Sequence, residues 1–388
     1  MTLIRKRWIA IGAAALAAST ALAGCSSAKS GGGSTAGSST ASSPGLAKAE
    51  QMVQTLEATT ASYPVPTAKI SGVSKLAGRT VYYIPLVQAI PGFVVTAASM
   101  KTALAAAGLN EHVCDGQGNP SAVAACVQQA VAAGAAGIVL DAVPYGMAQN
   151  ALDAAKAKNV PIIIADQYAP AGNTNDDHVT YVQGVVDQPS DIAWWAIADS
   201  KGSAKIILAE ESDSTSSEQY VQNSLAIYKQ YCPGCDVKVK MISATTDSQL
   251  ATDTSSNILT DSGVDYYYTE FEDSLQPTIQ GVQQSGKSSS ISLSVAGGSV
   301  FGLGLLKSGS DSIKAVVAVD QAYAGYALTD EILRMATGTA PADEPFPTRL
   351  FTTANIGTIQ VTTAAQSSGA WFGDSSFAAS YTALWGVG

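Results

Sequence analysis

The sequence predicts an α/β protein built on parallel sheets, because short apolar runs alternate with segments of helical periodicity. Two of these runs, Gly137–Asp141 and residues 160–165, are typical of strands that are buried on both faces. Strands joined by helices must lie parallel, and open parallel sheets bind ligands beyond the carboxyl ends of their strands. Asp141 and Asp166 fall at two such ends, so both are expected at the ligand-binding edge.

The same alternation extends along most of the chain. Strands are predicted at residues 80–85, 112–114, 180–182, 206–209, 237–242, 266–269, 292–296 and 315–319. Helices are predicted at residues 46–61, 94–107, 188–200, 217–231, 249–259, 275–285 and 323–336. Residues 88–93 are expected to form a loop. In the helix at 188–200, Trp194 and Trp195 should face different ways, with one ring buried and the other on the lobe surface.

Composition limits the class of protein. The chain has 388 residues, enough for two domains, with 46% hydrophobic and 13% charged residues, so a sizeable core is expected. Its formal net charge is −10, and it becomes −13 if the three basic residues near the N-terminus are removed. This acidic balance argues against nucleic acid as a partner, because phosphates require a basic surface.

The N-terminus has the pattern of an export signal. Arg5, Lys6 and Arg7 precede an apolar stretch at residues 8–23 that is too short to span a bilayer comfortably. The sequence Leu-Ala-Gly-Cys ending at Cys25 resembles the lipobox of bacterial lipoproteins. That resemblance implies a signal peptide at residues 1–24 and a lipidated Cys25 that anchors the protein outside the cytoplasm. An ordinary secretory signal is the alternative.

Two further segments precede the main fold. Residues 25–45, composed largely of Ser, Gly, Ala and Thr, are expected to form a flexible linker after the lipidated cysteine. Residues 46–75 are expected to form an N-terminal helix and an extension. A soluble domain on such a tether would be held close to the membrane surface.

The other four cysteines are expected to form disulfides, because the protein is exported. Cys232 and Cys235 have C-x-x-C spacing, for which a structural disulfide is favoured over redox chemistry or half a zinc site. Cys114 and Cys126 are expected to pair, although Cys126 alone would suit a core position. No metal site and no cofactor are predicted, since the chain has neither a P-loop nor a dinucleotide-binding fingerprint.

The chain resembles the type I periplasmic binding proteins, in particular the ribose-type sugar-binding components of ABC importers. The resemblance lies in residues 81–85 with 91–93, in 133–140 and in 159–166. It implies two doubly wound parallel-sheet lobes joined by a hinge that the chain crosses three times, near residues 182–184, 320 and 343–347. The implied lobes are residues 76–182 plus 321–343, and residues 183–320 plus 344–388.

The resemblance also implies a site between the lobes. Phe93 matches the aromatic residue that stacks on a sugar, and Asp166 matches a carboxylate that accepts from ligand hydroxyls. Gln167 replaces an arginine of the family, and the helix at 217–231 lacks another. The family's pair of Asn and Asp after a later strand is replaced by the segment Glu270-Phe271-Glu272-Asp273. Acidic strand ends without arginines would suit a polyol, an amino sugar or another cationic solute. The candidate ligand-binding residues are Gln88, Phe93, Asp166, Gln167, Glu211, Glu270, Phe271, Asp320 and Gln321.

These observations predict a monomeric, membrane-anchored protein that captures a small polar solute and delivers it to an ABC permease. A sensory receptor on the same fold, signalling to a membrane kinase or chemoreceptor, is the alternative. An exported enzyme is disfavoured, because the two histidines have no catalytic or metal-ligand spacing.

Overall fold

The structure, a computed structural model, describes residues 43–170, 175–184, 188–212, 215–243, 247–261, 263–309, 312–342 and 344–387. The predicted signal peptide, Cys25 and all but the end of the predicted linker lie outside these residues. Within them, no helix combines the length and the hydropathy that crossing a bilayer requires. The description below concerns the part of the chain that starts at residue 43.

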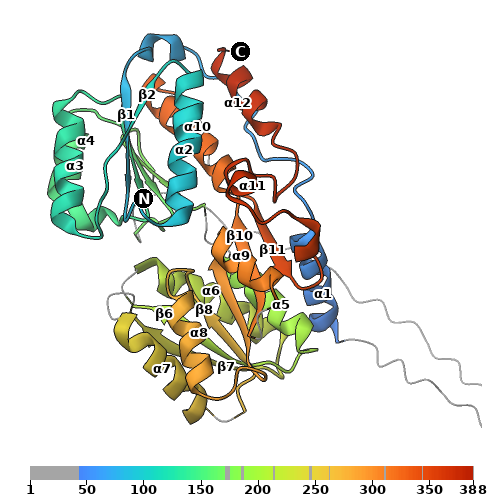
Figure 1. Ribbon diagram of the computed structural model, residues 1–388. Coiled ribbons are helices and arrows are strands. Elements are labelled where there is room, and N and C mark those ends of the chain that lie inside the picture. Colours follow the sequence, from blue (N-terminus) through green and yellow to red (C-terminus); the bar gives the residue numbers. More distant parts are fainter. Residues whose placement is uncertain are drawn as a thin grey trace, which may run out of the picture. The chain divides into compact units, whose positions relative to one another are not determined.

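The first sheet is entirely parallel and has the strand order β2-β1-β3-β4-β5. Its strands are β1 (Thr80–Pro85), β2 (Asn110–Val113), β3 (Gly137–Asp141), β4 (Ile162–Ala165) and β5 (Val179–Val182). Its helices are α2 (Pro91–Ala106), α3 (Pro120–Ala132), α4 (Gln149–Lys156) and α10 (Gln321–Thr337), with short turns η1 (Val73–Leu76) and η2 (Tyr145–Ala148). Figure 1 shows α2 and α10 on one face of the sheet and α3 and α4 on the other.

The second sheet is parallel except at one edge, with the order β11-β10-β9-β8-β6-β7. Its strands are β6 (Lys205–Glu211), β7 (Asp236–Ile242), β8 (Tyr266–Thr269), β9 (Ser292–Gly297), β10 (Ile313–Val319) and β11 (Thr348–Thr352). Its helices are α5 (Gln188–Asp199), α6 (Thr215–Tyr231), α7 (Asp247–Thr260), α8 (Leu275–Gln284) and α9 (Val300–Lys307). The edge strand β11 and helix α9 were not predicted from the sequence.

The central strands of each sheet are buried on both faces, so the fold has two lobes with separate cores. In the first lobe, Met100 and Tyr323 belong to one core cluster, while Val127 and Ile164 belong to the other. In the second lobe, the two clusters flank the sheet in the same way. The continuous apolar runs that predicted these strands therefore reflect burial on both sides.

The chain passes between the lobes in the segments that follow β5, β10 and α10. The first sheet ends at Val182 and α5 begins in the second lobe at Gln188; β10 then leads into α10, which packs on α2 of the first lobe. The return to β11 runs through residues 338–347, of which residue 343 lies outside the described part. The expected hinge segments thus connect elements of different lobes.

Both ends of the described chain also span the lobes. Helix α1 (Pro44–Glu57) packs on α5 and β11, while Ile70 and Val73, which follow it, belong to the first core. After β11 come η4 (Ile356–Thr358), α11 (Thr363–Ser367) and α12 (Phe377–Trp385). The sequence placed residues 344–388 in the second lobe, but α12 packs against α10 in the first core, because Phe377 and Trp385 join its aromatic cluster.

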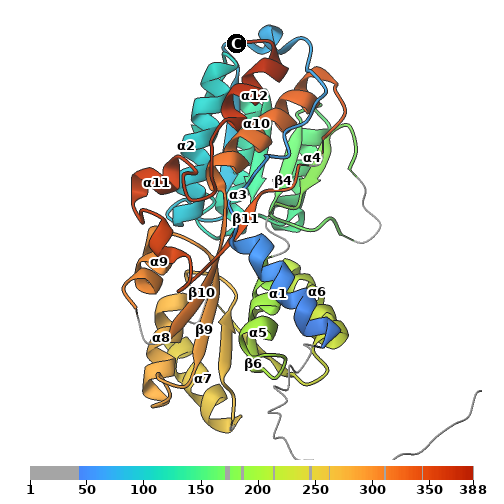
Figure 2. The same ribbon diagram turned by 90° about the vertical axis from the view of Figure 1, so that its right-hand side faces the viewer.

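The paired tryptophans correct a second expectation. Trp194 and Trp195 are both buried, with 8% and 4% of their surface exposed. Trp194 contacts the ring of Tyr231 and Trp195 that of Tyr266. Figure 2 shows the reason: α1 lies across α5 and α6 and covers the face that would otherwise be exposed.

Candidate functional site at the strand ends

Two aspartates meet at the carboxyl end of the first sheet. Asp141 ends β3 and lies next to Ala165 of β4, so Asp166 follows directly beside it. Both side chains are buried, and the Tyr83 hydroxyl donates to Asp141 Oδ2 at 2.6 Å. The backbone of Asp166 has φ = 56°, a left-handed conformation that aspartate tolerates better than most residues. The two carboxyl groups form a defined pair, which we call the carboxyl pair.

Burial raises the pKa of both members of the carboxyl pair. For Asp166 the negative charge of Asp141 and the hydrogen bond to it raise the pKa further, well above the usual value. For Asp141 the effect of burial is partly offset, chiefly because the hydrogen bond from the Tyr83 hydroxyl favours its ionised form. Two ionised carboxylates buried side by side repel each other, which adds to the cost of burying both charges.

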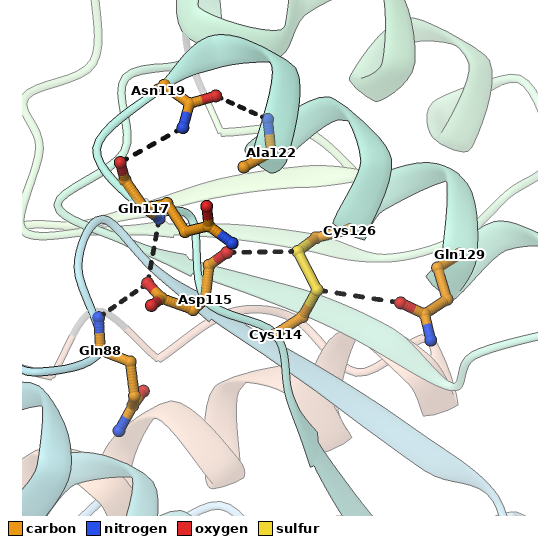
Figure 3. The surroundings of a disulfide bond; sticks show 8 residues. All are labelled: Gln88, Cys114, Asp115, Gln117, Asn119, Ala122, Cys126 and Gln129. Carbon is orange, nitrogen blue, oxygen red and sulfur yellow. Dashed lines mark hydrogen bonds between the residues drawn. A yellow bond between two sulfur atoms is a disulfide. The ribbon is translucent and has the colours of Figure 1, made fainter.

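The neighbouring loop is fixed by a disulfide (Figure 3). Cys114 and Cys126 are joined, and the sulfur of Cys126 lies 3.7 Å from the carbonyl oxygen of Asp115. Asp115 Oδ1 accepts from the backbone amides of Gln88 and Gln117, each at 2.9 Å. The disulfide therefore holds the loop after β2, and that loop holds the backbone of Gln88 after β1. The Gln88 Oε1 atom is buried and accepts no hydrogen bond from the described residues.

Phe93 lies on the first turn of α2 and is half-buried. The expected loop at 88–93 is thus shorter, because Pro91 starts the helix at a position where its missing N–H costs nothing. Gln321 begins α10 beside it: Thr96 donates to Gln321 Oε1 at 2.7 Å. The start of α2 and the start of α10 therefore present Phe93 and Gln321 near the same edge of the first lobe.

Asp320 has a structural role in the described conformation. It is fully buried and caps α10, where its Oδ1 accepts from the Tyr323 amide at 3.0 Å and its Oδ2 from the Tyr63 hydroxyl at 2.8 Å. Burial raises the pKa of Asp320 to about 6, although these hydrogen bonds lower it. Both carboxyl oxygens already have partners within the chain.

Acidic residues also follow the strands of the second sheet. Glu270 is fully buried after β8, and its Oε2 accepts from the amide of Glu211 at 2.7 Å. Glu211, at the end of β6, accepts from the Ser274 hydroxyl at 2.7 Å. Burial raises the pKa of Glu270 to about 8, whereas the Glu211 amide and the Ser217 hydroxyl lower it. Phe271 follows Glu270 and is half-buried.

Glu272 caps a helix. Its carboxylate accepts from the Ser299 amide at 2.8 Å, from the Ser299 hydroxyl at 2.9 Å and from the Gly302 amide at 2.6 Å. These donors belong to the start of α9, whose first N–H groups have no partner within the helix. In the acidic segment after β8, Glu272 therefore has a structural role as a cap of α9.

The two lobes touch directly next to the carboxyl pair. Asp166, Gln167 and Tyr168 of the first lobe meet Ser216, Tyr220 and Asn223 of α6, and we call these six residues the interlobe contact. The hydroxyl of Ser216 donates to Gln167 Oε1 at 3.0 Å, that of Tyr220 to the Asp166 carbonyl at 3.1 Å, and the amide of Asn223 to Tyr168 Oη at 2.9 Å. The rings of Tyr168 and Tyr220 lie 5.4 Å apart. Since α6 follows β6, the carboxyl ends of both sheets face each other here.

The structure places the candidate residues in two groups. Five lie at the carboxyl edge of the first lobe: Gln88, Phe93, Asp166, Gln167 and Gln321. Three lie at that of the second, namely Glu211, Glu270 and Phe271, whereas Asp320 lies at the crossing and caps α10. Their contact with a ligand stays a prediction. The interlobe contact on α6 was not predicted, because polar residues on a helix give no signal of what they meet 48 to 55 positions away.

Both predicted disulfides are present, at Cys114–Cys126 and Cys232–Cys235. In the part of the chain that the structure describes, no group of three or more His, Cys, Asp or Glu side chains is arranged to hold a metal ion.

Comparison with known proteins identifies the family. A profile of the periplasmic binding protein domain matches residues 81–340. The chain belongs to this family of extracytoplasmic binding proteins, and it is accordingly a solute-binding protein and not an enzyme. Among proteins of curated function, none matches the sequence.

Solved structures of low sequence identity share the fold. A 5-methylthioribose transporter solute-binding protein from Thermotoga lettingae, in complex with 5-methylthioribose, is 12% identical with a TM-score of 0.66, over 80% of this chain and 98% of that one. An ABC transporter solute-binding protein from Bacillus halodurans with bound myo-inositol is 14% identical with a TM-score of 0.60, over 73% and 97%. One from Agrobacterium vitis bound with α-D-tagatopyranose is 17% identical with a TM-score of 0.63, over 72% and 96%.

Proposed function

We propose that the protein captures a small polar solute, a sugar or a polyol, between its two lobes and delivers it to the permease of an ABC importer. The observation that carries this proposal is the interlobe contact, which brings the carboxyl ends of both sheets face to face. Ligands of open α/β sheets bind at such ends. The structural neighbours bound to a methylthiopentose, an inositol and a ketose support the class of solute.

The candidate residues suit a hydroxylated, uncharged solute. Phe93 offers an aromatic face for the C–H side of a sugar, while Gln88, Asp166 and Gln321 offer oxygen and amide groups for hydroxyls. Among the described residues, no lysine or arginine follows a strand at the carboxyl edge of either sheet. A phosphate or a carboxylate on the solute would therefore lack a cationic partner there.

A thermal-shift screen of neutral sugars, polyols, amino sugars and sugar acids tests this function. A solute present at 100 times its dissociation constant should raise the free energy of unfolding by about 2.7 kcal/mol. We expect stabilisation by a neutral or cationic member of the screen and none by the sugar acids. Stabilisation by sugar acids alone would contradict the proposed class of solute.

We further propose that Cys25 is lipidated and anchors the mature protein, as a monomer, to the outer face of the cell membrane. The support is the export pattern of residues 1–25, which lie outside the described residues. Cys25→Ser should release the protein from membranes in a fractionation experiment. Persistent membrane association of that variant would place the anchor elsewhere, and sedimentation of the soluble form would test the monomeric state.

A further inference from the structure

The carboxyl pair has buried oxygens that lack a donor. The Oδ1 atoms of Asp141 and Asp166 are both buried, and neither receives an N–H or O–H from another described residue. The two residues end up side by side because Asp141 is paired with Ala165 in the neighbouring strand. Carboxylate oxygens only accept hydrogen bonds, and two ionised carboxylates buried together repel each other strongly, whereas a proton on one of them removes the repulsion and supplies a donor.

The donors around the pair decide which aspartate carries the proton. Asp141 accepts from the Tyr83 hydroxyl at 2.6 Å, which favours its ionised form. Asp166 receives no such donor on its side chain, and its carbonyl oxygen, not its carboxyl, accepts from Tyr220. Asp141 is therefore the anionic acceptor and Asp166 the donor.

We infer that Asp141 is a positioning residue of the solute site: it binds the proton-bearing carboxyl of Asp166, so that Asp166 meets the solute as a neutral group of fixed orientation. The role of Asp166 toward the solute rests on the proposed function. The presence of the shared proton does not depend on that function. The O–H of Asp166 donates to Asp141. The other carboxyl oxygen of Asp166 is then the one that accepts from a solute hydroxyl.

The surroundings of the pair keep the proton in place. Tyr83 from β1 and Tyr220 from α6 are the titratable groups that face it from neighbouring elements, and burial raises the pKa of both. Glu111 on β2 acts on Tyr83 and also has a raised pKa, of about 7, through burial. No lysine, arginine or histidine is among the charged groups that act on either aspartate in the described part of the chain. Nothing nearby thus stabilises a second negative charge.

The arrangement also limits the solute. A hydroxyl can donate to the neutral Asp166, whereas an anionic group would meet the negative charge of Asp141 behind it. The proton is thereby part of the specificity of the site, and it disfavours sugar acids and sugar phosphates relative to polyols.

The test measures the stability of the ligand-free protein against pH for the wild type and for Asp141→Asn, Asp166→Asn and Asp153→Asn. A carboxyl group whose pKa is raised on folding stabilises the protein fully below its unfolded pKa of about 3.9, and that stability is lost as pH rises through the folded pKa. Each proton retained on folding lowers the folding equilibrium constant about tenfold per pH unit in this window. Other groups whose pKa is raised on folding, such as Glu270, contribute equally in wild type and variant, so their contributions cancel in the difference.

We expect both Asp166→Asn and Asp141→Asn to lose stability less steeply than the wild type as the pH rises. The difference in the folding equilibrium constant should amount to as much as about tenfold per pH unit. Asp153, an exposed residue on α4, is the matched control, and Asp153→Asn should follow the wild-type slope. Curves that run parallel to the wild type, offset by a constant amount, would show that the pair only packs and would overturn the inference.

Direct titration of the aspartate carboxyl carbons by NMR covers the case in which a variant does not fold. In the wild type, two aspartate signals in addition to that of Asp320 should shift at a pH well above the ordinary value, and both should change in Asp141→Asn or Asp166→Asn. Titration of every aspartate other than Asp320 near or below the ordinary pKa of about 3.9 would overturn the inference. Because neither measurement uses a solute, either outcome leaves the proposed transport function to its own screen.

Discussion

Acidic residues follow the strands of both sheets, but the two lobes hold them differently. In the first lobe, Asp141 and Asp166 are buried side by side, and we infer that they share a proton. In the second, Glu270 and Glu272 accept from backbone amides of neighbouring segments. The same residue type at the same topological position therefore orients a candidate ligand-binding group in one lobe and satisfies orphan N–H groups in the other.

The difference arises from what surrounds each strand end. Beside Glu272, α9 begins with unpaired amides, and a carboxylate is the natural acceptor for them. Beside Asp166, the adjacent strand also ends in an aspartate, so the two carboxyls can be buried together only if one is neutral. Acidic strand ends alone do not identify a ligand site; the donors around them do.

The largest expected effect on stability is the loss of the disulfide at the carboxyl edge of the first lobe. The Cys114–Cys126 disulfide closes a separation of 12 residues and the Cys232–Cys235 disulfide one of 3. By the chain-entropy argument, replacing each pair with serines should cost about 3 and about 2 kcal/mol of stability, respectively. Urea denaturation measures both values.

The same two variants distinguish the regions functionally. Loss of the first disulfide should also weaken solute affinity, because Asp115 would no longer fix Gln88. Loss of the second should leave affinity unchanged, since it lies at the end of α6 away from its N-terminal contact. Equal affinities in the two variants would show that the loop after β2 does not support the site.

A smaller effect is expected in the second lobe. Glu272→Ala removes a half-buried acceptor from three donors at the start of α9, which should lower the free energy of unfolding by about 2 kcal/mol. Glu272→Gln keeps one acceptor oxygen and should lose less. If both variants unfold at the wild-type urea concentration, the capping role assigned to Glu272 is wrong.

The smallest expected effect concerns the interlobe contact. Ser216→Ala removes its hydrogen bond with Gln167 and a weaker one from the Tyr168 amide. Together they should stabilise the conformation in which the lobes touch around the solute, which we call the closed form, by about 1 kcal/mol, so their loss should lower solute affinity roughly fivefold. Calorimetric titration measures it, and Gln222→Ala, exposed on the same helix, is the control. An affinity equal to that of the control would mean that the contact does not favour closure.

Much of the fold could be predicted because burial on both faces leaves continuous apolar runs, as at Gly137–Asp141. The edge strand β11 was missed because its sequence mixes Thr, Arg and Phe without such a run. The burial of Trp194 and Trp195 was missed because α1 covers them from more than 130 positions away in the chain. Long-range coverage of this kind leaves no mark in the local pattern.

The candidate site was predictable only at the level of strand ends. Asp166 was placed correctly at the carboxyl edge, but its pairing with Asp141 depends on the register of β3 and β4, which the sequence does not reveal. The helical position of Phe93 was signalled by Pro91, which is common at the first position of helices. The partners of Gln167 and Asp320 come from distant segments and required the structure.

The central claim is that solute binds at the carboxyl edge of the first lobe, and calorimetric titration of Asp166→Ala tests it most directly. The solute is the one that the thermal-shift screen identifies, and Asp153→Ala on the exposed face of α4 is the control. Removing the Asp166 carboxyl leaves a solute hydroxyl unpaired, so affinity should fall by roughly 1–3 kcal/mol, about 5- to 150-fold, with the protein still folded. Phe93→Ala should lose a similar amount through stacking and burial. Wild-type affinity in both folded variants would contradict the account, because the solute would then bind elsewhere.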